Sequence, residues 1–210
     1  MAKTIIFDFW GTLVEQGVYS PIKQVKRLLG LYEMDYSEFV VTFEKAMMTE
    51  KFDSLHDAFV RVCEAFDIKH DEELIEELIG VWNKNWLLAK PYDETIEILK
   101  KLKEQYHLVL VANTDNFSVN GVLEKFKLKD LFQYIFLSCD LGMLKIDDGF
   151  YGKILKKINE DVNECLVVGD SVYSDIKPAE DAGIDTILVD RHGKRDYPKK
   201  IANLKELKWK

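Results

Sequence analysis

The sequence predicts an α/β protein with a doubly wound, Rossmann-like parallel sheet and an inserted, all-helical domain. Short and nearly continuous apolar runs recur along the chain, as is typical of strands buried on both faces of a parallel sheet. Helical patterns alternate with the later runs, which favours crossover connections between parallel strands. One long interval near the N-terminus holds helical patterns without a strand. The expected strands are residues 4–7, 108–112, 134–137, 165–168 and 186–189.

The helices expected between the later strands follow from apolar residues at helical spacing. Gly183 is well placed to end the last of them in a left-handed conformation. These helices cover residues 93–105, 118–126, 149–159 and 174–182.

The interval 17–89 breaks the alternation of strand and helix, since it holds four helical stretches and no convincing strand. We therefore assign residues 1–16 and 90–210 to a Rossmann-like core and residues 17–89 to an inserted helical domain. Gly17 and Lys90-Pro91 are the expected linkers between the two. The four stretches begin near residues 20, 36, 54 and 71.

Composition and charge limit the classes of function. The 210 residues are 47% hydrophobic and 31% charged, as in a globular protein, and the net charge of −8 argues against a nucleic-acid-binding face. The one basic stretch, 191–200, is expected to be a solvated loop. No apolar run reaches the length of a membrane span, and three widely spaced cysteines favour a reducing compartment. We expect a cytoplasmic protein that binds neither nucleic acid nor membrane; the oligomeric state is undefined, and a monomer is compatible with the sequence.

Chemically active residues follow four of the expected strands. Ligands of doubly wound sheets bind at the carboxyl ends of the strands, so these residues are expected to converge. Several carboxylates at one edge repel each other unless a cation lies among them, and Mg²⁺ binds through one or two carboxylates plus substrate phosphate. A lysine, a hydroxyl and turn amides donate to a transferring phosphoryl group. The set comprises Asp8, Thr114, Asp115, Lys145, Asp170 and Asp175.

The same residues resemble the four motifs of the haloacid dehalogenase superfamily. Residues 8–13 match the first motif, an Asp followed by two residues and then Gly-Thr-Leu. Thr114 matches the second motif, Lys145 the third, and residues 169–171 with Asp175 the fourth. The resemblance covers the whole chain, because that family also inserts a helical cap between its first two motifs. It implies a hydrolase with the fold described above.

The resemblance also implies the roles of the site residues. Asp8 would be the nucleophile and would form an aspartyl-phosphate. Thr114 and Lys145 would bind the phosphoryl oxygens, and Asp115 is grouped with them as a phosphate-binding residue. The substrate would be a small phosphate ester, chosen by the helical cap that closes over the site.

The implied cofactor is Mg²⁺. Asp8 and Asp170 would hold it, aided by the main-chain carbonyl of Trp10. Asp175 would either bind the metal through water or brace Lys145.

Trp10 departs from the pattern of the family's phosphatases. Those enzymes carry a second Asp two residues after the nucleophile, which protonates the leaving group and later activates water. The metal site tolerates the change because a backbone carbonyl serves there, but the acid is lost. A positioned acid or base contributes roughly a hundred- to ten-thousand-fold. Either another group serves, with Asp115 and Glu15 close in sequence, or the enzyme is slow on poor leaving groups.

Two other functions stay open from the sequence. The aromatic Trp10 is similar to the Tyr of the family's metal-independent 2-haloacid dehalogenases, which attack carbon. Asp170 argues against that activity, since those enzymes have small neutral residues there and an anionic haloacid would face several carboxylates. The remaining alternative is a non-catalytic phosphate sensor that keeps the binding residues without turnover.

Overall fold

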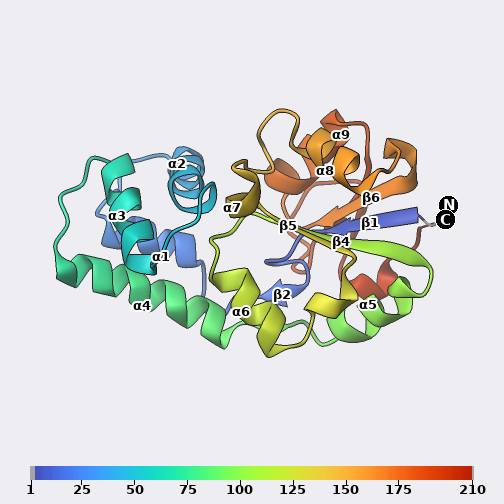
Figure 1. Ribbon diagram of the computed structural model, residues 1–210, viewed down its shortest axis with the longest axis horizontal. Coiled ribbons are helices and arrows are strands. Elements are labelled where there is room, and N and C mark those ends of the chain that lie inside the picture. The colour runs from blue at the N-terminus through green and yellow to red at the C-terminus, as the bar shows by residue number, and fades with distance from the viewer. Residues whose placement is uncertain (1–2, 210) are drawn as a thin grey trace.

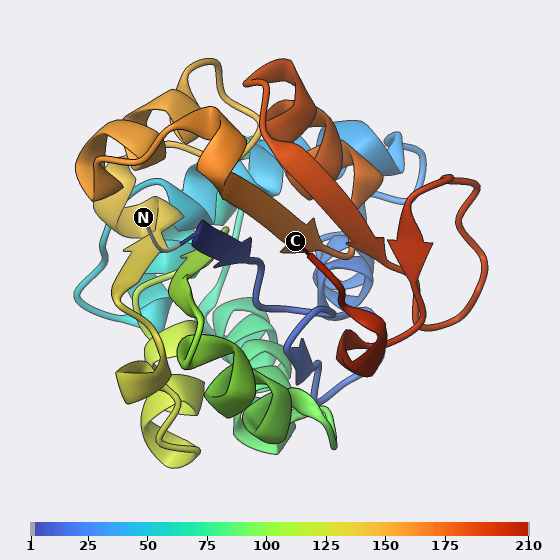
Figure 2. The same cartoon turned by 90° about the vertical axis from the view of Figure 1, so that its right-hand side faces the viewer.

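A six-stranded parallel sheet forms the centre of the larger body of the molecule (Figures 1 and 2). The computed structural model describes residues 3–209, so residues 1–2 and 210 of the predicted core lie outside it. Every pairing within this sheet is parallel, which confirms the predicted fold class. The strands, in their order across the sheet, are β5 (Tyr134–Leu137), β4 (Tyr106–Ala112), β1 (Lys3–Phe7), β6 (Cys165–Gly169), β7 (Asp185–Val189) and β8 (Lys200–Ile201).

Helices cover both faces of this sheet, which explains why its strands are continuously apolar. Ile5 of β1 belongs to the apolar cluster on one face, while its neighbour Ile6 belongs to the cluster on the other face. Both side chains are buried. Since successive side chains of a strand point to opposite faces, a strand covered on both sides needs apolar residues at every position. The covering helices are α5 (Thr95–Lys103) and α6 (Ser118–Lys125) on one face, and α8 (Phe150–Ile158) and α9 (Lys177–Asp181) on the other (Figure 1).

The helix predicted over 174–182 is divided in the structure. A π-helical turn covers Val172–Ile176, and α9 begins only at Lys177. Pro178 explains the division, because it has no N–H to give to the carbonyl four residues earlier. The elements that were not predicted include α7 (Ser138–Leu141), and β8 at the edge of the sheet. Neither is long enough to show a period in the sequence.

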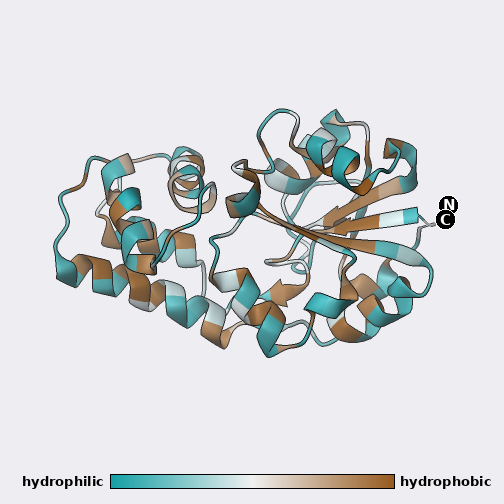
Figure 3. Ribbon diagram, in the orientation of Figure 1, coloured by the Kyte–Doolittle hydropathy of each residue, from teal (hydrophilic) through white to brown (hydrophobic). Residues whose placement is uncertain are grey.

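Four helices occupy the interval 17–89 and pack around a shared apolar cluster, to which Leu144 from the loop before Lys145 also belongs (Figure 3). The cluster includes Phe39, Phe43, Phe59 and Leu78, which are fully buried. Side chains at three helix starts satisfy free backbone N–H groups, as capping requires. The helices are α1 (Pro21–Leu28), α2 (Tyr36–Met48), α3 (Leu55–Ala65) and α4 (Glu72–Leu88).

The chain crosses between the sheet and these helices through a hydrogen-bonded ribbon. β2 (Val14–Glu15) pairs antiparallel with β3 (Lys90–Pro91), so the segment expected to be a free linker is a short strand. Gly17 also donates from its backbone N to the carbonyl oxygen of Asn85 in α4, at 3.1 Å. The two crossing segments are therefore held side by side.

Among residues 3–209, no helix combines the length and the apolar composition needed to cross a bilayer. Cys63, Cys139 and Cys165 are buried and free.

The close packing at the crossing predicts opposite effects for two glycine substitutions. A Cβ on Gly17 would lie 2.2 Å from the Asn85 carbonyl oxygen, so Gly17→Ala should lower the free energy of unfolding by roughly 1–3 kcal/mol. Gly80 in α4 is exposed and has nothing within 4 Å of such a Cβ, so Gly80→Ala should raise it by roughly 0.5–1 kcal/mol. Urea unfolding of both variants measures the difference. A Gly17→Ala protein as stable as Gly80→Ala would contradict the ribbon geometry.

Candidate active site

A buried ammonium group lies between two buried carboxylates at the carboxyl end of the sheet. Lys145 Nζ donates to Asp8 Oδ1 at 2.7 Å and to Asp175 Oδ1 at 2.5 Å. The side chains of all three are at most 8% exposed. The other oxygen of Asp8 accepts from the Thr12 hydroxyl at 2.8 Å. These three contacts orient Asp8 and Lys145 within the site, at the edge where the carboxyl ends of the parallel strands meet.

Asp170 adds a third carboxylate to this cluster. One oxygen from each of Asp8, Asp170 and Asp175 lies within 4.8 Å of the others. Burial, followed by the charges of Asp8 and Asp175, raises the pKa of Asp170 to about 8. Burial, followed by the charge of Asp175, raises the pKa of Asp8 to about 6. Burial is the larger cause of both shifts, and the neighbouring carboxylates add to it; a divalent cation would offset the repulsion among these acids.

The carboxylates of the cluster are not equivalent as metal ligands. Asp175 already uses one oxygen for Lys145 and the other for the backbone N of Ser171, at 2.9 Å. Asp170 has only a loose partner, the Arg195 guanidinium at 3.6 Å. Asp170 is therefore the carboxylate most free to hold a cation, whereas Asp8 and Asp175 each have a partner on both oxygens and both hold Lys145.

Two glycines allow the carboxylates to approach the backbone. A Cβ on Gly11 would lie 2.7 Å from Asp170 Oδ2, and one on Gly169 would lie 2.4 Å from Asp175 Cβ. Gly11 also has φ +81°, a conformation that side chains other than glycine rarely adopt. The glycines of the first and fourth motifs are thus required by the position of the acids.

Thr114 reaches the same cavity as Asp8, with its hydroxyl free for a ligand. It is 1% exposed. Among the buried side-chain nitrogen and oxygen atoms in the described part of the chain, its Oγ1 is the one without a hydrogen-bond partner. Because an unpaired buried hydroxyl costs free energy, a ligand oxygen at this point would be stabilising.

The side chain of Asp115 does not line the cavity, so its carboxylate is not placed for the phosphate-binding role expected from the sequence. Its carboxylate accepts from Trp82 Nε1 at 2.8 Å, from the backbone N of Phe117 at 2.7 Å, and from both the backbone N and the hydroxyl of Ser118. These contacts satisfy the start of α6 and fix it to α4. The carboxylate therefore has a structural role.

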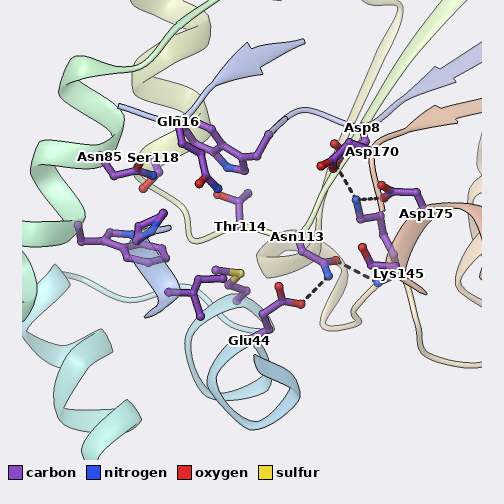
Figure 4. A pocket seen from close by; sticks show the side chains of 16 residues that line it. Asp8, Gln16, Glu44, Asn85, Asn113, Thr114, Ser118, Lys145, Asp170 and Asp175 are labelled. Carbon is purple, nitrogen blue, oxygen red and sulfur yellow. Dashed lines mark hydrogen bonds and ion pairs between the residues drawn. The ribbon is translucent and has the colours of Figure 1, made fainter. Parts of the chain in front are cut away.

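The site opens into a cavity of about 150 Å³ between the sheet and the inserted helices (Figure 4). Trp10 lines it from the core, and Glu44, Met48 and Trp82 line it from the helices. The carboxylate of Glu44 accepts from Asn113 Nδ2 at 2.8 Å, across from Asp8. Glu44 was missed by sequence analysis because it lies in the middle of α2, outside any motif.

Arg191 is a second residue that the sequence did not reveal. It lies in the basic stretch expected to be solvated, yet its side chain is 12% exposed. Its guanidinium donates to the carbonyl of Thr12 at 2.6 Å, pairs with Glu94 at 2.8 Å, and stacks on the ring of Tyr92 at 3.4 Å. Arg191 thereby holds the turn that follows the nucleophile candidate Asp8.

Comparison with known proteins identifies the family. A sequence profile described as haloacid dehalogenase-like hydrolase matches residues 2–183. The chain belongs to this family. The resemblance in the four motifs, and the hydrolase class that it implied, are confirmed.

Relatives and solved structures agree with this membership. The glyceraldehyde 3-phosphate phosphatase of Pyrococcus abyssi is 24% identical over 195 residues, which cover 89% of this chain and 81% of the relative. The magnesium-bound structure of the HAD-hydrolase YfnB of Bacillus subtilis has a TM-score of 0.67 at 20% identity, covering 98% and 96% of the two chains. The 2-haloacid dehalogenase of Pseudomonas syringae has a TM-score of 0.65 at 20% identity, covering the same shares. The structural likeness shows the shared fold.

The acidic cluster predicts how the stability of this hydrolase depends on pH in EDTA. The folded protein holds a proton on Asp170 up to about pH 8, whereas an unfolded Asp loses it near pH 4. This contribution to stability is complete below about pH 4 and is lost as the pH rises through about 8. Wild type should therefore lose stability relative to Asp170→Asn between about pH 5 and pH 8.

Urea unfolding of both proteins across this range gives the difference. Asp148→Asn removes an exposed carboxylate and serves as the matched control, which should follow wild type. A stability difference between wild type and Asp170→Asn that does not change with pH would contradict the raised pKa.

Proposed function

We propose that this hydrolase is a Mg²⁺-dependent phosphatase that acts on small phosphate esters through an aspartyl-phosphate at Asp8. The observation that carries the proposal is the position of Asp8, hydrogen-bonded to Lys145 within a cluster of three buried or partly buried carboxylates. That cluster has more negative charge than Lys145 can neutralise. A divalent cation and a phosphoryl group would complete it.

The contacts support a role for each of these residues. Asp8 attacks phosphorus, and Lys145 with the free hydroxyl of Thr114 binds the phosphoryl oxygens. Asp8, Asp170 and the carbonyl of Trp10 would hold Mg²⁺, which neutralises the charge of the transferring group. Asp175 keeps Lys145 in place through its short ion pair.

We also propose that residues 17–89 act as a cap that closes over the strand ends. These helices share an apolar core, and the cavity lies between them and the sheet. Closing such a site excludes water from the reacting phosphoryl group. The cavity volume of about 150 Å³ suits a small ester, in keeping with the triose phosphate named for the Pyrococcus abyssi relative.

The metal-independent dehalogenase is disfavoured by the charges at the site. Among the described residues that line the cavity, Lys145 is the one cation, and it is already bound to Asp8 and Asp175. The carboxylate of a haloacid would therefore lie beside Asp8, Asp170 and Asp175 without a free partner.

The activity test is hydrolysis of p-nitrophenyl phosphate with Mg²⁺ and with EDTA, beside chloride release from 2-chloropropionate. We expect Mg²⁺-dependent release of p-nitrophenol and no chloride. Asp8→Asn should lower kcat at least ~1,000-fold, because the neutral amide cannot attack phosphorus. Asp148→Asn should keep wild-type activity.

Mass spectrometry of Asp8→Asn should exclude deamidation back to Asp. Chloride release that persists in EDTA would replace the phosphatase with the dehalogenase. If the protein binds phosphate but shows neither activity, it is a sensor.

A further inference from the structure

An alkoxide leaving group needs a proton, and the residue at position 10 cannot supply one. Trp10 lines the cavity, but an indole N–H is a hydrogen-bond donor without useful acidity. The two acids considered from the sequence are also unsuitable. Asp115 is fully occupied by four hydrogen bonds, and Glu15 lies on the ribbon, half-exposed and 3.7 Å from Lys90.

The lining of the cavity leaves one carboxyl group for this task. Among the described residues that line it, the acids are Asp8, Asp170, Asp175 and Glu44, and no histidine is present. The first three form the cluster that carries the nucleophile and fits the metal. Glu44 stands apart from that cluster, on the opposite, helical side of the cavity (Figure 4).

A relay of hydrogen bonds fixes Glu44 relative to the sheet. Its Oε2 accepts from Asn113 Nδ2 at 2.8 Å, and Asn113 Oδ1 accepts from the backbone N of Lys145 at 3.0 Å. Asn113 directly follows β4 and precedes Thr114. The other carboxyl oxygen of Glu44 has no hydrogen bond or ion pair to any of residues 3–209. It is free to meet a substrate that bridges the cavity.

The surroundings of Glu44 suit proton transfer at neutral pH. Burial raises its pKa to about 7 from an ordinary 4.5; the Asn113 hydrogen bond and Lys145 lower it, and Asp175 and Asp8 raise it. Tyr36, on the same helix, interacts with Glu44 electrostatically. A carboxyl group with a pKa close to the working pH can both donate and accept a proton within one cycle.

We propose that Glu44 is the proton donor to the leaving oxygen, and then the base that activates water, in the phosphatase reaction proposed above. As an Asp8 oxygen bonds to phosphorus, the bond from phosphorus to the leaving oxygen breaks. That oxygen keeps the electron pair and takes the proton of Glu44, so the alcohol departs. Water then bonds to phosphorus and gives one proton to Glu44, while the bond to Asp8 breaks and phosphate leaves. Asp8 and Glu44 return to their starting states.

The inference assigns the acid to the helical domain, whereas the nucleophile belongs to the sheet. The reaction would then require the inserted helices to be closed over the core. Glu44 lies on α2, and its hydrogen bond to Asn113 holds it beside the core. The core alone would hold the phosphoryl group without being able to release an alkoxide.

The test is a series of aryl and alkyl phosphates whose leaving groups differ in pKa, measured as kcat/KM at one Mg²⁺ concentration. Poor leaving groups need the proton and p-nitrophenolate does not. Glu44→Gln should therefore lower kcat/KM for alkyl phosphates by about a hundredfold or more, with less than about a threefold change for p-nitrophenyl phosphate. Gln keeps the acceptor for Asn113, so the fold should be retained.

Two variants complete the design. Glu44→Asp keeps an acid and should recover part of the alkyl phosphatase activity. Glu38→Gln removes an exposed carboxylate from the same helix and should match wild type. An equal loss in Glu44→Gln for all leaving groups, carried in KM, would make Glu44 a binding residue and overturn the inference. A wild type that hydrolyses no phosphate ester would instead overturn the proposed function.

Discussion

The ion pairs of Lys145 with Asp8 and Asp175 are the interaction on which the site depends. They join three segments that are far apart in the chain, and they do so where the side chains are almost completely buried. Removing one partner of such a group leaves a buried, uncompensated charge, which costs several kcal/mol. The order of the strands makes the contact possible, because β1 lies between β4 and β6 at the centre of the sheet. The nucleophile candidate therefore lies at the midpoint of the edge where the other motifs end.

The loop after β4 connects this centre with the inserted helices. Asn113 binds Glu44 of α2, Asp115 binds Trp82 of α4, and Asn116 exchanges two hydrogen bonds with the backbone of Phe52. Thr114, between them, presents its free hydroxyl to the cavity. A single loop thus contacts both helices and carries a candidate phosphate ligand. Any movement of the helices away from the sheet would break these contacts together.

Much of this arrangement could be predicted from the sequence because it follows from local patterns. Continuous apolar runs indicated the parallel strands, and residues at their ends had to converge, which placed Asp8, Lys145, Asp170 and Asp175 together. Glu44 and Arg191 could not be predicted in the same way. Glu44 binds a residue 69 positions away and Arg191 binds the turn 179 positions away, and nothing local distinguishes either from a solvated charge. The sequence predicted the position of Asp115 beside Thr114, but it could not predict the direction of the Asp115 side chain. That direction depends on the distant Trp82, which donates a hydrogen bond to the carboxylate.

The most direct test of the account is to find where the phosphoryl group goes. The wild-type protein would be mixed with a phosphate ester and Mg²⁺, quenched in acid within one turnover, and digested for mass spectrometry. We predict that the peptide containing Asp8 carries the mass of one phosphoryl group, located on Asp8. Dilution into buffer without the ester before the quench should remove this group at the rate of turnover. Release of phosphate with Asp8 unmodified at every quench time, or a phosphoryl group on another residue, would contradict the assignment of Asp8 as the nucleophile.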